Sequence, residues 1–573
     1  MRPRLPALVL SVALGFHAGC ASRASPPPPP PTEAQQLASR VARSSSAAES
    51  LLQAQDLLVW NYWAEGLRGD MAATYTGQES LFTLDSIHDI ERLRQQASGP
   101  REVRALTTLQ AHFAGEYLSQ QLAEVSDALA NLEASLTFQV EGREVRWHEL
   151  ERQLANERSA PRRKALYAAA TPALERLVPL IRRRAERTEA LLKELGYASY
   201  EAFGGELRQA DLDRLGVLAE EVLQATEAPY KQVMERLAQR ELGTSYANLT
   251  RADLPRLFRS REVEGLFLKG EQLRRAHGTL AGMDIDLSEM KNVRIDARED
   301  VKGKNPRPLA LGIRVPGDVR LSVRSVGGAL EQAKMLHEFG HTLHYAFTTE
   351  PRFELAKLGN PTVTEAYAAL FEDLMEDPVW LEEHAGLKDR ERAEFLATTS
   401  SHKLFLIRRA AGRLLYQLAL HRQGETAEAR ELYKAMIARV DVLPATDDDV
   451  ARYLVDQEDF FQSADNFRAW FLAGQLQGQL KARFGPAWWH SAEAGTFLKG
   501  LWAHGNALSA REVAQSLGEP GIVPDVLLLR LGTTLDVPIK LGAHEEPPAQ
   551  APAPEAPKPE APAAPEPAPA PAG

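Results

Sequence analysis

The residues best suited to chemistry in this chain lie in the sequence His-Glu-Phe-Gly-His at positions 337–341, which is followed by a glutamate at position 365. In a helix, residues i and i+4 lie on one face, so His337 and His341 direct their imidazoles to one point. Glu365 adds a carboxylate. Two imidazole nitrogens and one carboxylate leave the fourth position of a tetrahedral Zn²⁺ open, as in catalytic zinc sites. The pattern therefore predicts one zinc ion per chain, bound by His337, His341 and Glu365.

Glu338 lies one step round the same helix and is suited to act as a base. Zinc lowers the pKa of a coordinated water to about 7, and Glu338 is placed to accept the proton of that water as it attacks a carbonyl. This is the chemistry of peptide hydrolysis. The alternative is a core helix that contains two histidines by chance, but the Phe-Gly filling of the motif and the downstream glutamate argue against it.

Two helices must position these side chains. Residues 329–347 carry an apolar stripe beside the histidine stripe, which predicts a helix that packs on one face and binds metal on the next. The second helix is expected to be capped by Thr362 or Thr364 and to end at Asp377, before a proline. Glu365 then lies in the first turns of that helix.

The motif resembles the active-site helix of the thimet oligopeptidase and oligoendopeptidase F family, in which another histidine follows three residues on, here His344. The spacing to Glu365 and the Asn-Pro-x-x-x-Glu-Ala pattern at residues 360–366 are similar to the angiotensin-converting enzyme family of peptidyl-dipeptidases. The resemblance covers residues 290–531 recognisably, and the amino-terminal half only by its helical character.

This resemblance implies a mainly α, gluzincin-type peptidase body with a deep channel between two halves and a small β-hairpin or sheet at the rim of the active site. It also implies short peptides as substrates. The residues that it assigns agree with those chosen from the pattern: His337, His341 and Glu365 as metal ligands and Glu338 as general base.

A hairpin is expected just before the zinc helix. Apolar and other residues alternate in residues 309–315 and 319–323, on either side of a Pro-Gly-Asp turn. A strand beside the zinc can bind an extended peptide by pairing with it at the sheet edge. An ordinary hairpin that covers the core is the alternative.

The segment expected to stabilise the oxyanion departs from both families. They place a His and one or more Tyr within the region that corresponds to residues 450–484, whereas residues 459–470 contain neither. The nearest substitutes are Tyr453 and Arg468. We expect Tyr453, or a Tyr from a distant segment, to donate to the oxyanion, and Arg468 to bind the substrate. The alternative for Arg468 is an ion pair with Asp465 on the helix surface.

Two other classes of function remain open. The missing tyrosine fits a catalytically weak or inactive surface lipoprotein that binds peptides or a protein partner. The other class is a lipid-anchored structural module whose zinc only holds the fold together. The intact Glu338 argues against both, because a structural site needs no base beside an open coordination position.

The amino terminus indicates export. Residues 1–19 have two arginines followed by a short apolar run, and Cys20, the only cysteine of the chain, comes directly after them. This arrangement resembles the lipobox of bacterial lipoproteins, although His17 stands where such boxes usually have Leu. We therefore expect Cys20 to carry a lipid that anchors the protein to the cell envelope, at the outer membrane or facing the periplasm. A plain secretory signal is the alternative.

The rest of the chain is expected to form one large helical body. We assign residues 20–45 to a Pro-rich, lipid-anchored tether, 46–540 to the helical zinc peptidase domain, with its active-site core at 290–531, and 541–573 to a disordered Pro/Ala/Glu tail. Amphipathic helices are expected at 48–67, 103–132, 162–195 and 212–240. Trp60 and Trp63 are assigned to the core rather than to a channel. The net charge of −11 argues against a nucleic-acid partner, and we expect a monomer.

Overall fold

The computed structural model describes residues 31–259, 263–426 and 428–541, most of which are helical. The longest helices are α1 (Glu33–Glu65), α3 (Pro100–Ser135), α8 (Leu212–Leu242), α11 (Ala329–Phe347), α15 (Asp389–Gln423) and α18 (Gln462–Phe484). The shorter ones are α2 (Leu84–Gln96), α4 (Leu150–Asn156), α5 (Ala160–Glu175), α6 (Val178–Glu194), α7 (Tyr200–Arg208), α9 (Leu254–Leu257), α10 (Glu271–Gly282), α12 (Phe353–Ala356), α13 (Pro361–Glu372), α14 (Pro378–Trp380), α16 (Glu428–Asp441), α17 (Asp447–Val450), α19 (Ala492–Trp502), α20 (Ala510–Ser516) and α21 (Asp525–Leu535). The mainly α fold class is therefore confirmed.

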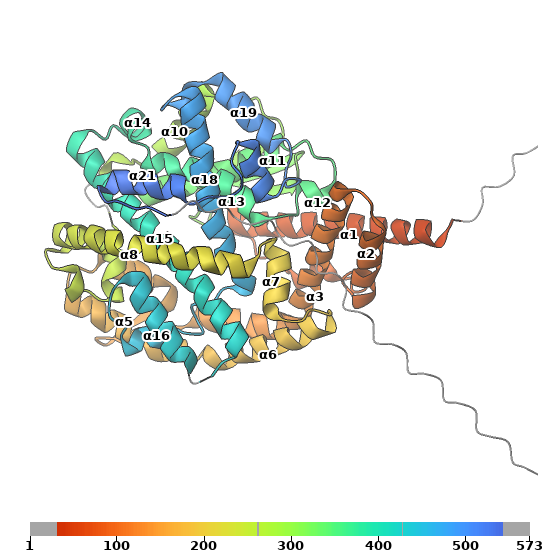
Figure 1. Ribbon diagram of the computed structural model, residues 1–573, viewed down its shortest axis with the longest axis horizontal. Helices are drawn as coiled ribbons and strands as arrows, with labels where there is room; N and C mark the ends of the chain where they lie inside the picture. Colours follow the sequence, from red (N-terminus) through yellow and green to blue (C-terminus); the bar gives the residue numbers. More distant parts are fainter. Residues whose placement is uncertain (1–30, 260–262, 427, 542–573) are drawn as a thin grey trace, which may run out of the picture.

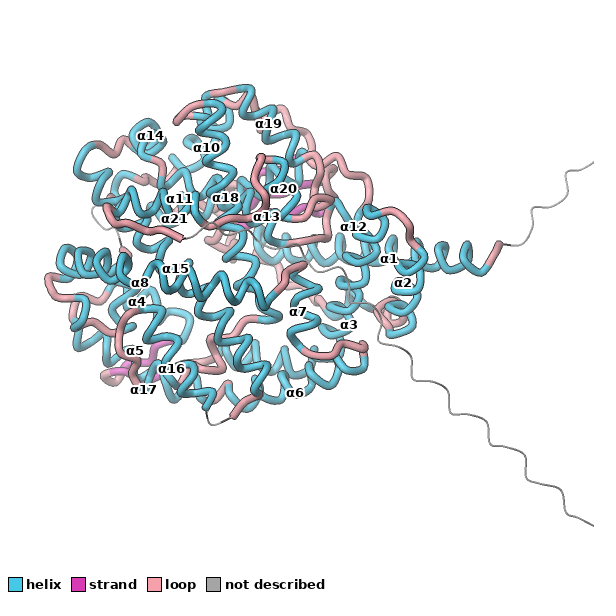
Figure 2. Tube along the Cα trace, in the orientation of Figure 1, coloured by secondary structure: helices cyan, strands magenta, loops and turns pink. Residues whose placement is uncertain are grey.

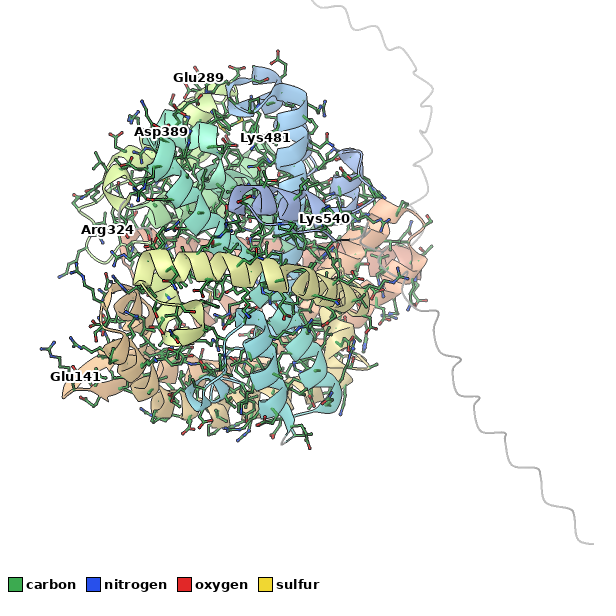
Figure 3. The ribbon with its side chains drawn as sticks, turned by 60° about the vertical axis from the view of Figure 1, so that its left-hand side comes forward. Glu141, Glu289, Arg324, Asp389, Lys481 and Lys540 are labelled. Atoms are coloured by element: carbon green, nitrogen blue, oxygen red, sulfur yellow. The ribbon has the colours of Figure 1, made fainter. Side chains whose placement is uncertain are left out.

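Helices α8 and α15 cross the middle of the body in Figure 1, with α11, α13 and α18 above them and α5, α6 and α16 below. The largest hydrophobic cluster joins α8, α11, α13, α15, α18 and α21. A second cluster joins α1, α2 and α3 with the end of α6. Charged side chains lie on the outside, as Figure 3 shows for Glu141 and Arg324. No helix of the described residues is both long enough and apolar enough to cross a membrane.

A three-stranded sheet precedes α11. Strand β4 (Leu309–Arg314) pairs antiparallel with β5 (Asp318–Ser322), so the predicted hairpin is confirmed. Strand β3 (Val293–Asp296) adds to β5 in parallel, which gives the order β3-β5-β4 and leaves β4 at one edge. A separate hairpin of β1 (Thr137–Val140) and β2 (Arg143–Arg146) lies beside α5 (Figure 2), in a region that we expected to be helical. Its two-residue turn has positive φ at both residues, as tight hairpins require.

The boundary expected between tether and domain is wrong. Residues 33–45, which we assigned to the tether, form the first part of α1. Thr32 and Gln35 make a reciprocal capping box there, and Leu37 and Val41 begin the buried face of the helix. The predicted helix at 162–195 is also two helices, α5 and α6, because Pro179 has no N–H to donate to the carbonyl of Glu175, where α5 ends. The signal segment, Cys20, the polyproline run and the tail from residue 542 lie outside the described residues.

Candidate metal centre and cavity

The structure brings the three predicted ligands together. His337 and His341 lie on α11, whose bounds are those expected from the sequence. The Nε2 atoms of His337 and His341 lie 3.5 and 3.7 Å from the carboxylate oxygens of Glu365. One ligand atom from each of the three residues lies within 4.8 Å of the other two. Three donors at this separation can surround a single cation.

Glu365 reaches the histidines because α13 runs very close to α11. A Cβ placed on Gly340 would lie 2.5 Å from Ala368 Cα and 2.5 Å from the carbonyl oxygen of Tyr367, so only glycine fits at this crossing. Helix α13 is capped by Asn360, whose side chain accepts from the N–H of Thr362 at 2.8 Å, and not by Thr362 or Thr364 as expected. The expected position of Glu365 in the first turns of this helix is confirmed.

The second nitrogen of each histidine is held by a residue that we did not predict. His337 Nδ1 lies 3.0 Å from Glu372 Oε2, and His341 Nδ1 lies 2.9 Å from Thr364 Oγ1. Metal-binding histidines usually donate their other N–H to a carboxylate or another oxygen, which fixes the ring and leaves one nitrogen for the metal. The donor set therefore fits a metal such as zinc. Glu372 follows Glu365 by seven residues, and this two-turn spacing on one helix face was a signal available in the sequence.

Buried charge around the histidines favours a cation. Burial alone would lower the pKa of His337, but hydrogen bonds to Glu365 and Glu372 raise it to about 10. Burial likewise opposes ionisation of Glu372, yet the charge of Lys403 and the hydrogen bond to His337 lower its pKa to about 2. At His341 burial outweighs the opposing charge of Glu365 and lowers the pKa to about 4. Both carboxylates therefore remain charged beside the two imidazoles, where a divalent cation would neutralise them.

Glu338 follows His337 on α11, interacts electrostatically with His337, Glu365 and Glu372, and is held by the sheet. The main-chain N–H of Ala310 on β4 donates to Glu338 Oε2 at 2.7 Å. Burial raises the pKa of Glu338 to about 7. A carboxylate fixed in this way, with its pKa near neutrality, is suited to accept a proton at neutral pH.

A cavity of about 1960 Å³ borders this centre and is lined by Glu338 and Glu372, among other residues. One face of α15 lines it lengthwise through Phe395, Thr399, His402, Lys403, Leu406 and Arg409. Trp63 lies on its wall, contrary to our assignment to the core, and donates from Nε1 to the carbonyl of Arg307 at 2.7 Å. Trp60 is in the core, as expected, with 1 % of its surface exposed.

No family model and no curated protein matches this chain.

The structure does not bring Tyr453 and Arg468 to the centre. Tyr453 lies between α17 and α18, where its hydroxyl donates to Glu425 at 2.6 Å and accepts from Arg182 at 2.8 Å. Arg468 lies on α18 and donates from Nη1 to the carbonyl of Arg208 at 3.1 Å. Neither residue lines the cavity beside Glu338. The catalytic roles expected for them do not fit these positions, because both side chains are held within the packed body by other groups.

The alternative expected for Arg468, a pair with Asp465 on the helix surface, is wrong in its position, because both residues are buried, although the charge of Arg468 does act on Asp465. Asp465 is buried and accepts from Arg208 at 2.8 Å and from Thr362 at 2.9 Å. Arg468 is 4 % exposed and also contacts Thr362, at 3.4 Å. These two residues therefore belong to the buried contact between α18 and the start of α13.

Proposed function

We propose that this protein is a zinc metallopeptidase that hydrolyses short peptides, with Glu338 as general base. One observation carries the proposal. The donors of His337, His341 and Glu365 converge beside a large cavity, and Glu338 lies on the wall of that same cavity. The resemblance of the motif to the oligopeptidase and converting-enzyme families supports the same reading. A deep channel between two halves, expected from that resemblance, is part of this proposal.

The residues of the chain have distinct roles in this reaction. Zinc bound by His337, His341 and Glu365 would polarise the peptide carbonyl and acidify water. Glu372 and Thr364 hold the two imidazole rings with Nε2 turned toward the ligand position. Glu338 accepts the proton of the attacking water, and the Ala310 N–H keeps its carboxylate oriented for that transfer.

Pairing of an extended peptide with β4 is part of the proposal in a restricted form. Strand β4 is at the edge of the sheet, as this mode of binding requires. However, the N–H of Ala310 is already used by Glu338, and the carbonyl of Gly312 accepts from Lys357 Nζ at 2.9 Å. A peptide on this edge would therefore pair with only some of its main-chain groups.

Export and a lipid anchor on Cys20 complete the proposed function and rest on the sequence of residues 1–20 alone. The protein would then act on peptides in the cell envelope, as a monomer bound to the membrane through its lipid.

A second candidate is a catalytically weak or inactive, metallopeptidase-like surface lipoprotein that binds peptides or a protein partner. The positions of Tyr453 and Arg468 favour it, because the two side chains expected to stabilise the oxyanion are engaged elsewhere. Loss of one such donor costs a hydrolase about 10² to 10³ in rate. Zinc supplies part of that stabilisation, so slow turnover rather than none is the expected consequence.

The deciding experiment combines metal analysis with hydrolysis of a quenched fluorescent peptide library. Glu338→Gln should keep one zinc per chain and lose turnover by about 10² or more, because only the proton acceptor is removed. Glu331→Gln is the matched control, since Glu331 is on the same helix and lines the same cavity but pairs with Lys334. Wild-type turnover in Glu338→Gln would place the base elsewhere. Zinc-loaded wild-type protein without turnover would establish the second candidate instead.

A further inference from the structure

Arg452 lines the cavity, and no carboxylate of the described residues pairs with it. It lies just after α17, only 6 % of its surface is exposed, and it lines the same cavity as Glu338. Its guanidinium carbon lies 4.1 Å from the ring centre of Tyr167 and 5.3 Å from that of Trp147. Among the described residues, no side chain or carbonyl accepts a hydrogen bond from Nε or Nη2, and both atoms are enclosed. Nη1 is therefore the nitrogen left accessible from the cavity.

The acidic side chains of the surrounding segments are already paired with other groups. Asp441 and Asp456 lie 3.0 and 3.7 Å from the guanidinium of Arg251. Asp449 accepts from the hydroxyl of Tyr167 at 2.8 Å. These contacts hold the wall of the cavity in place, and within the part of the chain that the structure describes Arg452 has no carboxylate as an ion-pair partner.

A guanidinium in an enclosed site without a paired carboxylate is unfavourable, and a carboxylate that reaches Nη1 from the cavity would neutralise its charge. The two aromatic rings hold the guanidinium plane in position, so little side-chain freedom remains to be lost when an anion binds. The cavity has a volume of about 1960 Å³, and both Arg452 and Glu338 line it. The arrangement is that of a prepared subsite for an anionic group.

The distance from the metal centre follows from α15. Lys403, part-way along the cavity face of α15, pairs at 3.0 Å with Asp373, the residue after Glu372, and Arg409 at the end of that face approaches Asp456, near Arg452, at 3.6 Å. Residues 403 and 409 are separated by roughly 9 Å along a helix. An extended peptide advances about 3.3 Å per residue, so this distance corresponds to about three residues.

We propose that Arg452 binds a carboxylate of the peptide, about three residues from the bond that is cleaved, so that this protein prefers substrates with an anionic group at that distance. The proposal rests on the proposed peptidase function. The carboxylate comes either from the free carboxyl terminus of the peptide or from an acidic side chain, and the experiment separates these two sources.

Binding is measured by fluorescence anisotropy with zinc-loaded, full-length protein that carries Glu338→Gln. Four labelled peptides share one sequence; the carboxyl terminus is a free acid or an amide, and one internal residue is Glu or Gln. Arg452→Met is the test variant, because Met keeps an unbranched apolar side chain between the two rings. Arg259→Met is the control, since Arg259 lines the same cavity but pairs with Glu264 at 3.0 Å.

A peptide with the correct carboxylate should bind about 10- to 100-fold more tightly than its uncharged counterpart. Arg452→Met should abolish this difference and leave the affinity for the neutral peptide unchanged, whereas Arg259→Met should retain the difference. Arg452→Lys, which keeps the charge, should retain part of it. A preference for the free acid over the amide identifies the carboxyl terminus as the source of the carboxylate. A preference for Glu over Gln identifies the side chain.

The proposal is overturned if all four peptides bind equally to the protein that carries Glu338→Gln alone. It is also overturned if the Arg452→Met protein loses affinity for charged and neutral peptides alike, because that result means a structural role. Mass spectrometry of the recovered peptides reports separately on the proposed function. Cleavage by the Glu338→Gln protein would contradict the role of Glu338, while the comparison between charged and neutral peptides would still decide the role of Arg452.

Discussion

Replacing Gly340 by Ala tests how the metal centre is assembled, because Gly340 is where α11 and α13 meet. The added Cβ would lie 2.5 Å from Ala368 Cα and 2.5 Å from the carbonyl oxygen of Tyr367. Carbon atoms in ordinary contact are about 3.5 to 4.0 Å apart. Both opposing atoms belong to the main chain, so no side-chain rotation relieves the overlap. The two helices must separate by about 1 Å.

Two effects of opposite sign determine the stability of this variant. Ala is favoured over Gly inside a helix by about 1 kcal/mol, whereas overpacking typically costs about 1 to 3 kcal/mol. The expected result is a net loss of up to about 2 kcal/mol. Gly115→Ala in α3 is the control, because no atom lies within 4 Å of a Cβ at that position. That variant should gain up to about 1 kcal/mol.

The separation should also weaken metal binding. Metal sites tolerate changes of only about 0.2 Å in their ligand distances, and Glu365 moves with α13. We expect Gly340→Ala to lose zinc affinity by at least about 10-fold, a loss of the size seen when supporting contacts of a metal site are removed. Calorimetry and competition with a fluorescent chelator measure the two effects. A Gly340→Ala protein with wild-type zinc affinity and a melting temperature raised like that of Gly115→Ala would refute the argument.

Two further substitutions test the surroundings of the centre. Glu372→Gln should lower zinc affinity by about 10- to 100-fold, because it weakens the hydrogen bond that fixes His337; Glu376→Gln removes a neighbouring carboxylate without touching a histidine and is the control, and equal losses in both would mean a general charge effect. Lys304→Met should cost about 3 kcal/mol at pH 7, because it breaks a buried pair with Asp296 at 2.9 Å. Burial opposes ionisation of Asp296, but hydrogen bonds from Arg298 and Lys304 hold its pKa well below the ordinary range, so its contribution is present above about pH 4 and is lost as the pH falls further. Urea unfolding of the wild type and of Lys304→Met should therefore show a smaller difference in the free energy of unfolding at pH 3 than at pH 7. The same difference at both pH values would contradict the role of the Lys304–Asp296 pair.

Local patterns in the sequence predicted the part of the site that depends on local structure. An apolar period of 3.6 residues predicted the bounds of α11 and placed His337 and His341 on one face. A period of 2 residues predicted the hairpin of β4 and β5. The contact with Glu365 was expected from the motif and from the resemblance, and its physical cause, the close crossing at Gly340, required the structure.

Residues that act through the tertiary fold were not predicted correctly. Tyr453 was chosen as the nearest tyrosine to residues 459–470, which contain none, yet the turns after α17 direct its hydroxyl toward Glu425 and Arg182. The pairing of β3 with β5 is parallel and links segments more than 20 residues apart, so no hairpin signal marks it. Whether Arg452 has a carboxylate partner depends on which acidic side chains near it are already paired. That depends on the tertiary structure and could not be predicted from the sequence.

The bond from Ala310 to Glu338 has a consequence for how this site can vary among relatives. The group that orients the carboxylate is a main-chain N–H, so the identity of the side chain at position 310 contributes nothing to that bond. Every residue except proline supplies the same donor. As far as this bond is concerned, position 310 therefore accepts every residue except proline. A comparison of side chains among relatives would not reveal that this position orients the base.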